Sequence, residues 1–245
     1  MEKGFLMKKT LLITGGSKGL GLVIVKEFLK KDFNIIILDR NELDVTLTIQ
    51  ESQHIKFHKI DLSDVNQMKA FTQSLEQNKT VIDVLALNAA PRVFKDFDSF
   101  THQEINDLSN ASFVSSLMLL NTILGRMKIK NSGKIIIISS KSGLKGYSTG
   151  ALYCAFKSAW ITFHESISRE LKHVKGLSIL TICPDSFSNN DGSKRIGHAK
   201  IINKITRKIS SFLNDNNSEL YFPSRHKTKI SYILLFIKKL KLTIK

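Results

Sequence analysis

The chain has 245 residues, of which 42% are hydrophobic and 24% charged, which argues against disorder and allows one domain with a full core. Its two cysteines exclude a disulfide-rich secreted scaffold, and residues 1–9 show no signal-peptide pattern, so we expect a cytoplasmic protein. No apolar run reaches ~18 residues, so no membrane-spanning helix is expected, whereas the net charge of +16 favours anionic partners.

Short apolar runs alternate along the chain with segments of helical periodicity. The runs are typical of parallel strands buried on both faces, and the periodic segments of helices that cover them. Strands are predicted at 10–14, 34–38, 55–60, 81–87, 133–139, 177–182 and 220–222. Helices are predicted at 19–31, from an N-cap at Ser63 to 77, at 103–130, at 150–173 and around 202–212. This order predicts a single α/β domain over residues 1–245, a doubly wound, Rossmann-like parallel sheet with helices on both faces.

Residues 186–245 are expected to form a substrate-side helix and a basic C-terminal tail. Residues 194–245 contain thirteen Lys and Arg residues and two acidic ones, which fits nucleic acid, an anionic membrane surface, an acidic partner protein or simply a solvated face. The apolar stripe in 230–240 could lie on a membrane surface or pack on the domain or a partner subunit. Nucleic-acid binding is not expected, because Trp160 and the fifteen phenylalanines are predicted core residues rather than a stacking platform for bases.

A glycine-rich turn follows the first predicted strand and reads TGGSKGLG over residues 14–21. Glycines let the backbone turn tightly and let a pyrophosphate approach, and the following helix points free N–H groups at the phosphates. The alternative is a tight strand-to-helix turn without a ligand. The candidate cofactor-binding residues of this turn are Gly15, Ser17, Lys18, Gly19 and Leu20.

The second predicted strand leads into Asp39 and Arg40. An acid about 20 residues beyond the glycines can accept hydrogen bonds from the adenosine ribose and would repel the 2′-phosphate of NADP. Lys18 and Arg40 argue the other way, because either could pair with that phosphate. NAD is therefore the preferred cofactor, with NADP as the alternative.

Tyr153 and Lys157 are four residues apart, which places them on one face of a predicted helix. A neighbouring ammonium favours the phenolate form of a tyrosine, so Tyr153 is a candidate general acid and base. Ser140 follows the fifth predicted strand, at the edge where such sheets bind ligands, and its hydroxyl could hold a substrate oxygen. A surface pair formed by chance is the alternative.

With these motifs, residues 8–190 resemble the short-chain dehydrogenase/reductase family in its compact form, with the TGxxxGxG and YxxxK motifs. The resemblance implies that Tyr153 is the catalytic acid and base and that Ser140 polarises the substrate carbonyl. It implies that Lys157 lowers the pKa of the tyrosine and holds the nicotinamide ribose.

The resemblance also implies roles outside these motifs. Asn110 would position a water for proton relay, and Asn88 would steady the central sheet near the cofactor. The remaining positions that it places around the cofactor are Asp61, Leu62, Ala89 and Pro184.

Two segments depart from the family pattern. The usual Asn-Asn-Ala-Gly reads Leu-Asn-Ala-Ala over residues 87–90, and the usual Pro-Gly after the sixth strand reads Pro184-Asp185. The second change puts a carboxylate where the nicotinamide is expected. The threonine that often contacts the nicotinamide carboxamide is replaced, by Ser188 or Asn189.

The resemblance implies an oxidoreductase that moves a hydride between a nicotinamide cofactor and a carbonyl or secondary alcohol. A nucleotide-binding regulator or scaffold with little turnover is the alternative, which Asp185 motivates. The expected substrate is a small molecule, free or linked to an acidic carrier protein, and the family implies a homodimer or homotetramer. No metal site is expected, because the histidines and cysteines lack ligand spacing.

Overall fold

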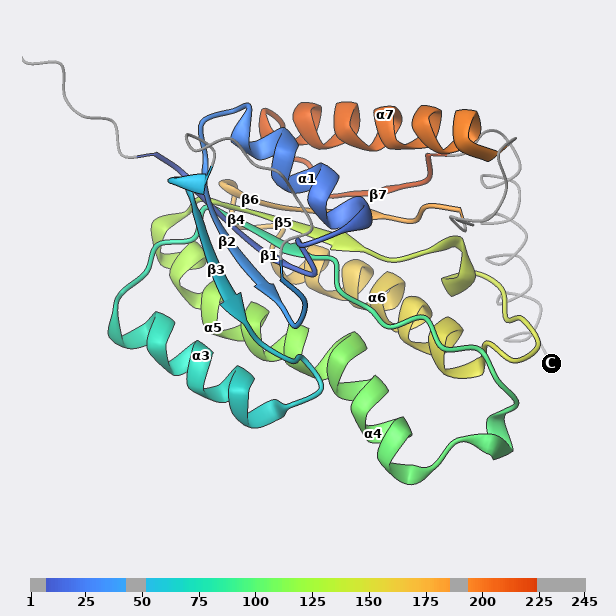
Figure 1. Ribbon diagram of the computed structural model, residues 1–245. Helices are drawn as coiled ribbons and strands as arrows, with labels where there is room; N and C mark the ends of the chain where they lie inside the picture. Colours follow the sequence, from blue (N-terminus) through green and yellow to red (C-terminus); the bar gives the residue numbers. More distant parts are fainter. Residues whose placement is uncertain (1–7, 43–51, 186–193, 224–245) are drawn as a thin grey trace, which may run out of the picture.

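The computed structural model describes residues 8–42, 52–185 and 194–223, which form one sheet with helices on both faces (Figure 1). Within these residues the sheet has seven strands in the order β3-β2-β1-β4-β5-β6-β7, and every neighbouring pair is parallel. The strands are β1 (Thr10–Thr14), β2 (Asn34–Asp39), β3 (Ile55–Lys59), β4 (Val84–Leu87), β5 (Gly133–Ile138), β6 (Leu177–Ile182) and β7 (Glu219–Tyr221). The predicted doubly wound α/β fold is confirmed.

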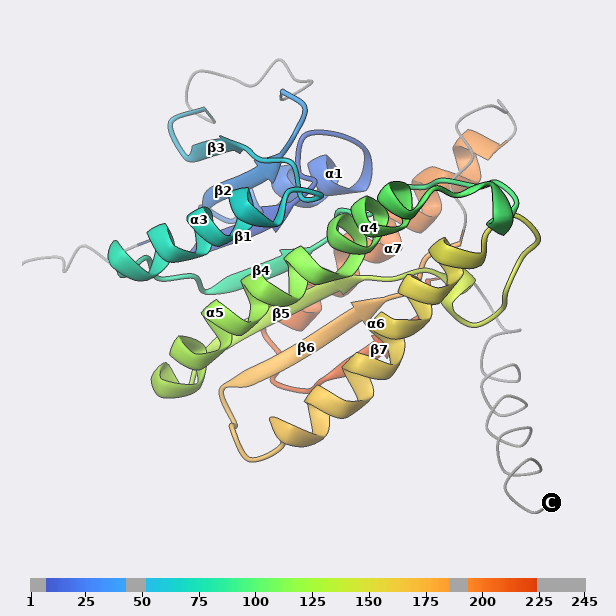
Figure 2. The ribbon, with the colours of Figure 1, turned by 90° about the horizontal axis from the view of Figure 1, so that it is seen from below.

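Helices flank the sheet in two layers. They are α1 (Gly19–Leu29), α3 (Val65–Gln77), α4 (His102–Ser109), α5 (Ser115–Lys130), α6 (Ala151–Glu170) and α7 (Lys194–Leu213). Helices α1 and α7 cover one face, where Phe28 and Ile205 are buried in the same apolar cluster (Figure 1). Helices α3, α5 and α6 cover the other face, where Met68, Leu119 and Trp160 belong to the second cluster (Figure 2).

The course of the chain through the sheet sets the position of the site. From β1 the chain winds outward through β2 and β3, and it then returns to β4 on the other side of β1. In doubly wound sheets ligands bind at this reversal, outside the carboxyl ends of the strands. The glycine-rich turn at the end of β1 lies at this point.

Most predicted element bounds agree with the structure to within three residues, and β1 and β6 agree at both ends, whereas α7 begins at Lys194, eight residues before the predicted start. The N-cap prediction was wrong. Asp64 is the N-cap of α3, and its carboxylate accepts the backbone N–H groups of Asn66 and Gln67 at 2.9 and 3.2 Å. Ser63 instead donates its hydroxyl to Asp61 at 2.8 Å. The stripe in 230–240 and the two candidate threonine replacements, 188 and 189, lie outside the described residues.

The long helix predicted over 103–130 is divided. A π-helical turn, Asn110–Val114 (η2), separates α4 from α5. By length and composition alone the whole run His102–Lys130 could cross a membrane. A helix that packs on a sheet has the same composition, and α5 buries Leu119 and Ile123 in the apolar cluster on that face.

Candidate functional site

The turn between β1 and α1 requires glycine at several positions. Gly15 and Gly19 have φ angles of 67° and 56°, in the left-handed region that glycine adopts without strain. A Cβ on Gly21 would lie 1.9 Å from the carbonyl oxygen of Gly15, so α1 can approach β1 only with glycine there. Lys18, the N-cap of α1, makes no side-chain capping bond. The first N–H groups of α1 can therefore bind an anion, as a dinucleotide pyrophosphate requires.

Asn88 fixes this turn against the end of β4. Its side-chain amide donates to the carbonyl oxygens of Thr14 and Gly15 at 3.2 and 2.8 Å. In return the Thr14 hydroxyl accepts the backbone N–H groups of Asn88 and Ala89 at 3.0 and 3.1 Å. This exchange joins the carboxyl ends of β1 and β4 and gives the glycine turn a fixed shape.

Asp39 ends β2 and contacts the same turn. One carboxylate oxygen accepts both the N–H and the hydroxyl of Ser17, at 3.1 and 2.5 Å, and the other accepts the N–H of Asn41 at 3.2 Å. The side chain is thus oriented before any ligand arrives. Lys18 and Arg40, the two predicted phosphate partners, are both exposed.

A pocket lies beside this turn, at the carboxyl ends of β4, β5 and β6. It brings together residues that are far apart in the sequence and come from five segments of the chain. The predicted site residues that line it are Leu20, Asn88, Ser140, Tyr153, Lys157 and Pro184. A phenol, an ammonium and a hydroxyl therefore share one pocket next to the glycine-rich turn between β1 and α1.

Lys157 is almost completely buried, with 4% of its surface exposed. Its Nζ donates to the carbonyl oxygen of Ile138 at 2.7 Å and lies 5.8 Å from the ring centroid of Tyr153. Burial lowers the pKa of Lys157 from 10.5 to about 8. The ammonium is thus held next to the tyrosine ring and is close to losing its proton at neutral to mildly alkaline pH.

Ser140 is placed by the turn that follows β5. Its Oγ accepts the backbone N–H of Ser142 at 3.1 Å, which begins a short 3₁₀ turn, Lys141–Gly143. The preceding Ser139 donates its hydroxyl to the carbonyl oxygen of Lys157 at 2.7 Å. This bond attaches the end of β5 to α6, so the helix that carries Tyr153 and the strand that carries Ser140 have a fixed relative position.

Asn110, Asp61 and Leu62 lie at the loop that follows β3. Asn110 is the first residue of the π-helical turn, and its amide donates to the carbonyl oxygen of Ser63 at 3.1 Å. It does not line the pocket. Asp61 accepts the N–H of Ser63 at 2.9 Å, and the Leu62 carbonyl accepts the hydroxyl of Ser115 at 2.6 Å. These contacts form the loop after β3, where the resemblance places the adenine.

Two charged residues complete the pocket. Asp185, which the sequence singled out, pairs with Lys141 at 2.5 Å, and the backbone N–H of Lys141 donates to Pro184 at 3.0 Å. Arg92 was missed by the sequence analysis, yet it lines the pocket. The signal for it was its position four residues after Asn88, in the segment that leaves the carboxyl end of a central strand.

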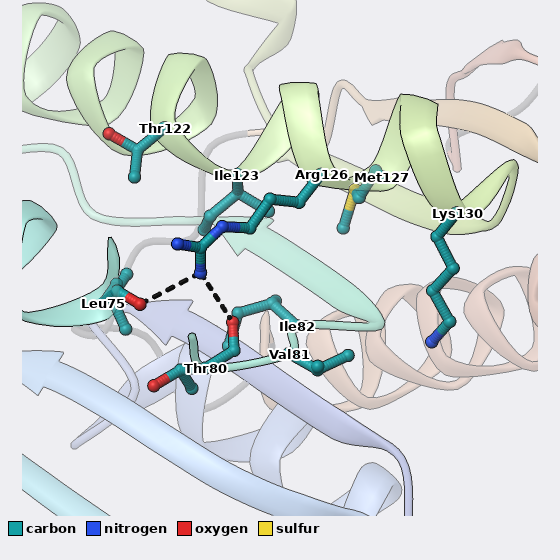
Figure 3. Close-up of a pocket in the computed structure, with 9 residues that line it drawn as sticks. All are labelled: Leu75, Thr80, Val81, Ile82, Thr122, Ile123, Arg126, Met127 and Lys130. Carbon is teal, nitrogen blue, oxygen red and sulfur yellow. Dashed lines mark hydrogen bonds between the residues drawn. The ribbon is translucent and has the colours of Figure 1, made fainter. Parts of the chain in front are cut away.

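A second pocket lies between the end of α3, the segment 80–82 that precedes β4, and α5, away from these residues (Figure 3). Arg126 reaches from α5 across it and donates to the carbonyl oxygens of Leu75 and Thr80 at 3.0 and 3.4 Å (Figure 3). It also donates to the carbonyl oxygen of Glu76 at 2.9 Å. The backbone N–H groups of Thr80 and Lys79 already donate to the carbonyl oxygens of Leu75 and Glu76, at 3.1 Å each, so Arg126 adds a second donor to each carbonyl and ties the end of α3 to α5. Since Arg126 joins α5 to the end of α3 across this pocket, we assign the pocket a role in stability.

Comparison with known proteins agrees with the fold and with the position of the pocket. A sequence model of the family described as short chain dehydrogenase matches residues 9–198. The chain belongs to this family. Short-chain dehydrogenases are an oxidoreductase family, and the fold and the position of the pocket in this member agree with that membership.

Named relatives illustrate the similarity. The ketoacyl reductase HetN of Nostoc sp. is 27% identical over 184 residues, which cover 74% of this chain and 64% of HetN. The 3-oxoacyl-[acyl-carrier-protein] reductase FabG of Chlamydia trachomatis is 28% identical over 198 residues, 79% of each chain. This short-chain dehydrogenase spans between 60% and 65% of the length of the first relatives.

A solved structure shows the shared fold. A short chain dehydrogenase from Leptospira borgpetersenii, determined with bound NAD+, has a TM-score of 0.71 over 87% of this chain and 91% of that one, at 21% identity.

Proposed function

We propose that this short-chain dehydrogenase is a nicotinamide-dependent oxidoreductase that interconverts a carbonyl and a secondary alcohol. The observation that carries the proposal is the pocket itself, in which Ser140, Tyr153 and Lys157 meet beside the glycine turn that leads into α1. The NAD+ bound to the Leptospira protein and the ketoacyl reductase names of the relatives support the same reaction class.

The chain's own residues supply orientation and proton transfer. A bound nicotinamide cofactor supplies or accepts the hydride. In the reductive direction the Tyr153 hydroxyl donates a proton to the substrate oxygen, which the Ser140 hydroxyl holds in place. The Lys157 ammonium, buried behind the ring, stabilises the phenolate that this donation leaves.

The further roles rest on the family resemblance. Lys157 would also hold the nicotinamide ribose, and Asn110 would carry the proton onward through a water. NAD is proposed over NADP, because the carboxylate of Asp39 is fixed by Ser17 beside the glycine turn and would repel a 2′-phosphate. Asp185, which motivated the alternative of a scaffold, forms an ion pair with Lys141. Its negative charge in the pocket is therefore compensated.

Tyr153→Phe tests the proposal. The variant should lose about 10³-fold in turnover of a ketone panel with NADH or NADPH, within the range for a removed general acid. Its affinity for the cofactor, measured by fluorescence titration, should stay within about twofold, because a phenol oxygen is the only group lost. Tyr147→Phe is the matched control, since Tyr147 is an exposed tyrosine in the loop before α6. Equal turnover by Tyr153→Phe and the parent would contradict the proposal.

A further inference from the structure

The π-helical turn η2 is anchored to the loop after β3 on one of its sides. Such turns are uncommon inside helices and occur frequently at functional sites. The turn is closed by the backbone N–H of Ser115, which donates to the carbonyl oxygen of Asn110 five residues earlier. The Asn110 amide donates to the carbonyl oxygen of Ser63 at 3.1 Å. The Ser115 hydroxyl donates to the carbonyl oxygen of Leu62 at 2.6 Å. These two side-chain bonds hold both ends of the turn against the loop.

Helix α6 supplies a bond on another side of the turn. The indole N–H of Trp160 donates to the carbonyl oxygen of Ser112, in the middle of the turn, at 3.0 Å. Trp160 is 3% exposed, and its ring contacts those of Phe113 and Phe163 edge-on, with centroids 4.7 and 5.6 Å apart. A buried indole N–H needs an acceptor, so this bond and the contact with Phe113 fix the distance between α6 and the turn.

The same helix carries the proposed proton donor. Tyr153, Lys157 and Trp160 lie on one face of α6, because residues three, four and seven apart share a face of a helix. Asn110 does not line the pocket that contains Tyr153 and Lys157, so the proposed proton relay needs a water between Asn110 and these side chains. Each step of a relay works only at hydrogen-bond distance. The distance between the turn and α6 therefore decides whether the relay is complete.

We infer that Trp160 is a positioning residue, whose indole N–H holds the π turn, and with it Asn110, at a fixed distance from Tyr153. The inference rests on the proposed oxidoreductase function, because it assigns Trp160 to the proton relay of that reaction. Trp160 belongs to the apolar cluster beneath the sheet and does not line the pocket, so the indole acts on proton transfer and not on the binding of substrate or cofactor.

Trp160→Phe tests the role of the N–H, because it keeps an aromatic ring in the apolar cluster. For a ketone that the parent reduces, kcat should fall about three- to tenfold, which corresponds to one lost hydrogen bond. The KM values for the ketone and for the cofactor should stay within about twofold of the parent's, because neither contacts the indole. The ratio of kcat in H2O to kcat in D2O should rise, because proton transfer becomes slower relative to the other steps. A change in KM alone overturns the inference.

A double-mutant cycle with Asn110→Ala tests whether the indole acts through Asn110. Asn110→Ala alone should lower kcat about tenfold or more, and the addition of Trp160→Phe should lower it by less than about twofold further. Phe163→Leu is the matched control, since it removes a ring that packs on the indole and leaves the N–H bonded to Ser112. Its isotope ratio should equal the parent's. Losses from Trp160→Phe and Asn110→Ala that add, or a parental kcat in Asn110→Ala, overturn the inference.

Hydrogen exchange keeps the test independent of turnover. If the parent reduces no ketone, the proposed function fails, and the exchange of the backbone amides of residues 110–117 still decides the positioning role of Trp160. In Trp160→Phe these amides should exchange at least about fivefold faster than in the parent, whereas Phe163→Leu should change their rates by less than about twofold. Equal exchange in Trp160→Phe and the parent overturns the inference. So does an equal acceleration by Phe163→Leu, because lost packing would then explain both.

Discussion

Replacing Lys157 by methionine should stabilise the folded protein at neutral pH while it removes turnover. The lysine is 4% exposed, and burial lowers its pKa from 10.5 to about 8. One pKa unit corresponds to about 1.4 kcal/mol, so the burial of the charged lysine lowers the free energy of unfolding by about 3 kcal/mol at pH 7. Methionine has a similar shape and no charge, but it leaves the carbonyl of Ile138 without its donor, which costs about 1 kcal/mol. The expected net gain at pH 7 is about 2 kcal/mol.

The pH dependence identifies the cause. The folded pKa lies below the unfolded one, so between about pH 8 and 10.5 the unfolded chain binds more protons and the parent becomes more stable as the pH rises. Urea unfolding without nucleotide should therefore show the advantage of Lys157→Met shrinking by about 2 kcal/mol between pH 7 and 9.5. Lys172→Met removes an exposed lysine beyond α6, and its difference from the parent should be the same at both pH values. An advantage of Lys157→Met that does not change with pH would refute the reasoning.

Two further substitutions test other parts of the structure. Asp39→Ala should increase the ratio of NADPH affinity to NADH affinity by at least about tenfold, because it removes the carboxylate that repels the 2′-phosphate. Fluorescence titrations with both nucleotides measure this ratio. An unchanged ratio would contradict the proposal that Asp39 selects NAD over NADP. Arg126→Met should lower the free energy of unfolding by about 1–3 kcal/mol, since it removes the charged hydrogen bonds that tie the Leu75 and Glu76 carbonyls at the end of α3 to α5, while turnover stays at the parent level. A loss of turnover without a loss of stability in Arg126→Met would show that the second pocket communicates with the first.

The sheet could be predicted from the sequence because each central strand is an uninterrupted apolar run, such as Ile135–Ile138, between segments of different periodicity. The position of the pocket could be predicted from the glycine turn and from Ser140 and Tyr153, since parallel strands end at the same edge. The contact of Asp39 with Ser17 was not predictable, because it joins side chains from two separate loops.

The N-cap of α3 and the position of Arg92 could not be predicted, because both depend on the path of the backbone and not on hydrophobic periodicity. Ser63 and Asp64 are both good N-cap residues, and only the backbone path decides which one accepts the helix N–H groups. Arg92 looks like any surface arginine until the loop after β4 places it over Tyr153. The last apolar stripe lies outside the described residues, so its membrane or packing role is still a prediction.

The π-helical turn before α5 has a consequence for how this chain tolerates length changes. A π turn holds one residue more than the α turn that it replaces, and each residue of an α-helix turns the chain by about 100°. If Asn110–Val114 rewound into regular α geometry at unchanged length, α4 would therefore rotate by about that angle relative to α5, and the amide of Asn110 would swing away from the loop after β3. A one-residue deletion that removes the extra residue keeps α4 in phase, so it should be less harmful than an insertion in the same segment.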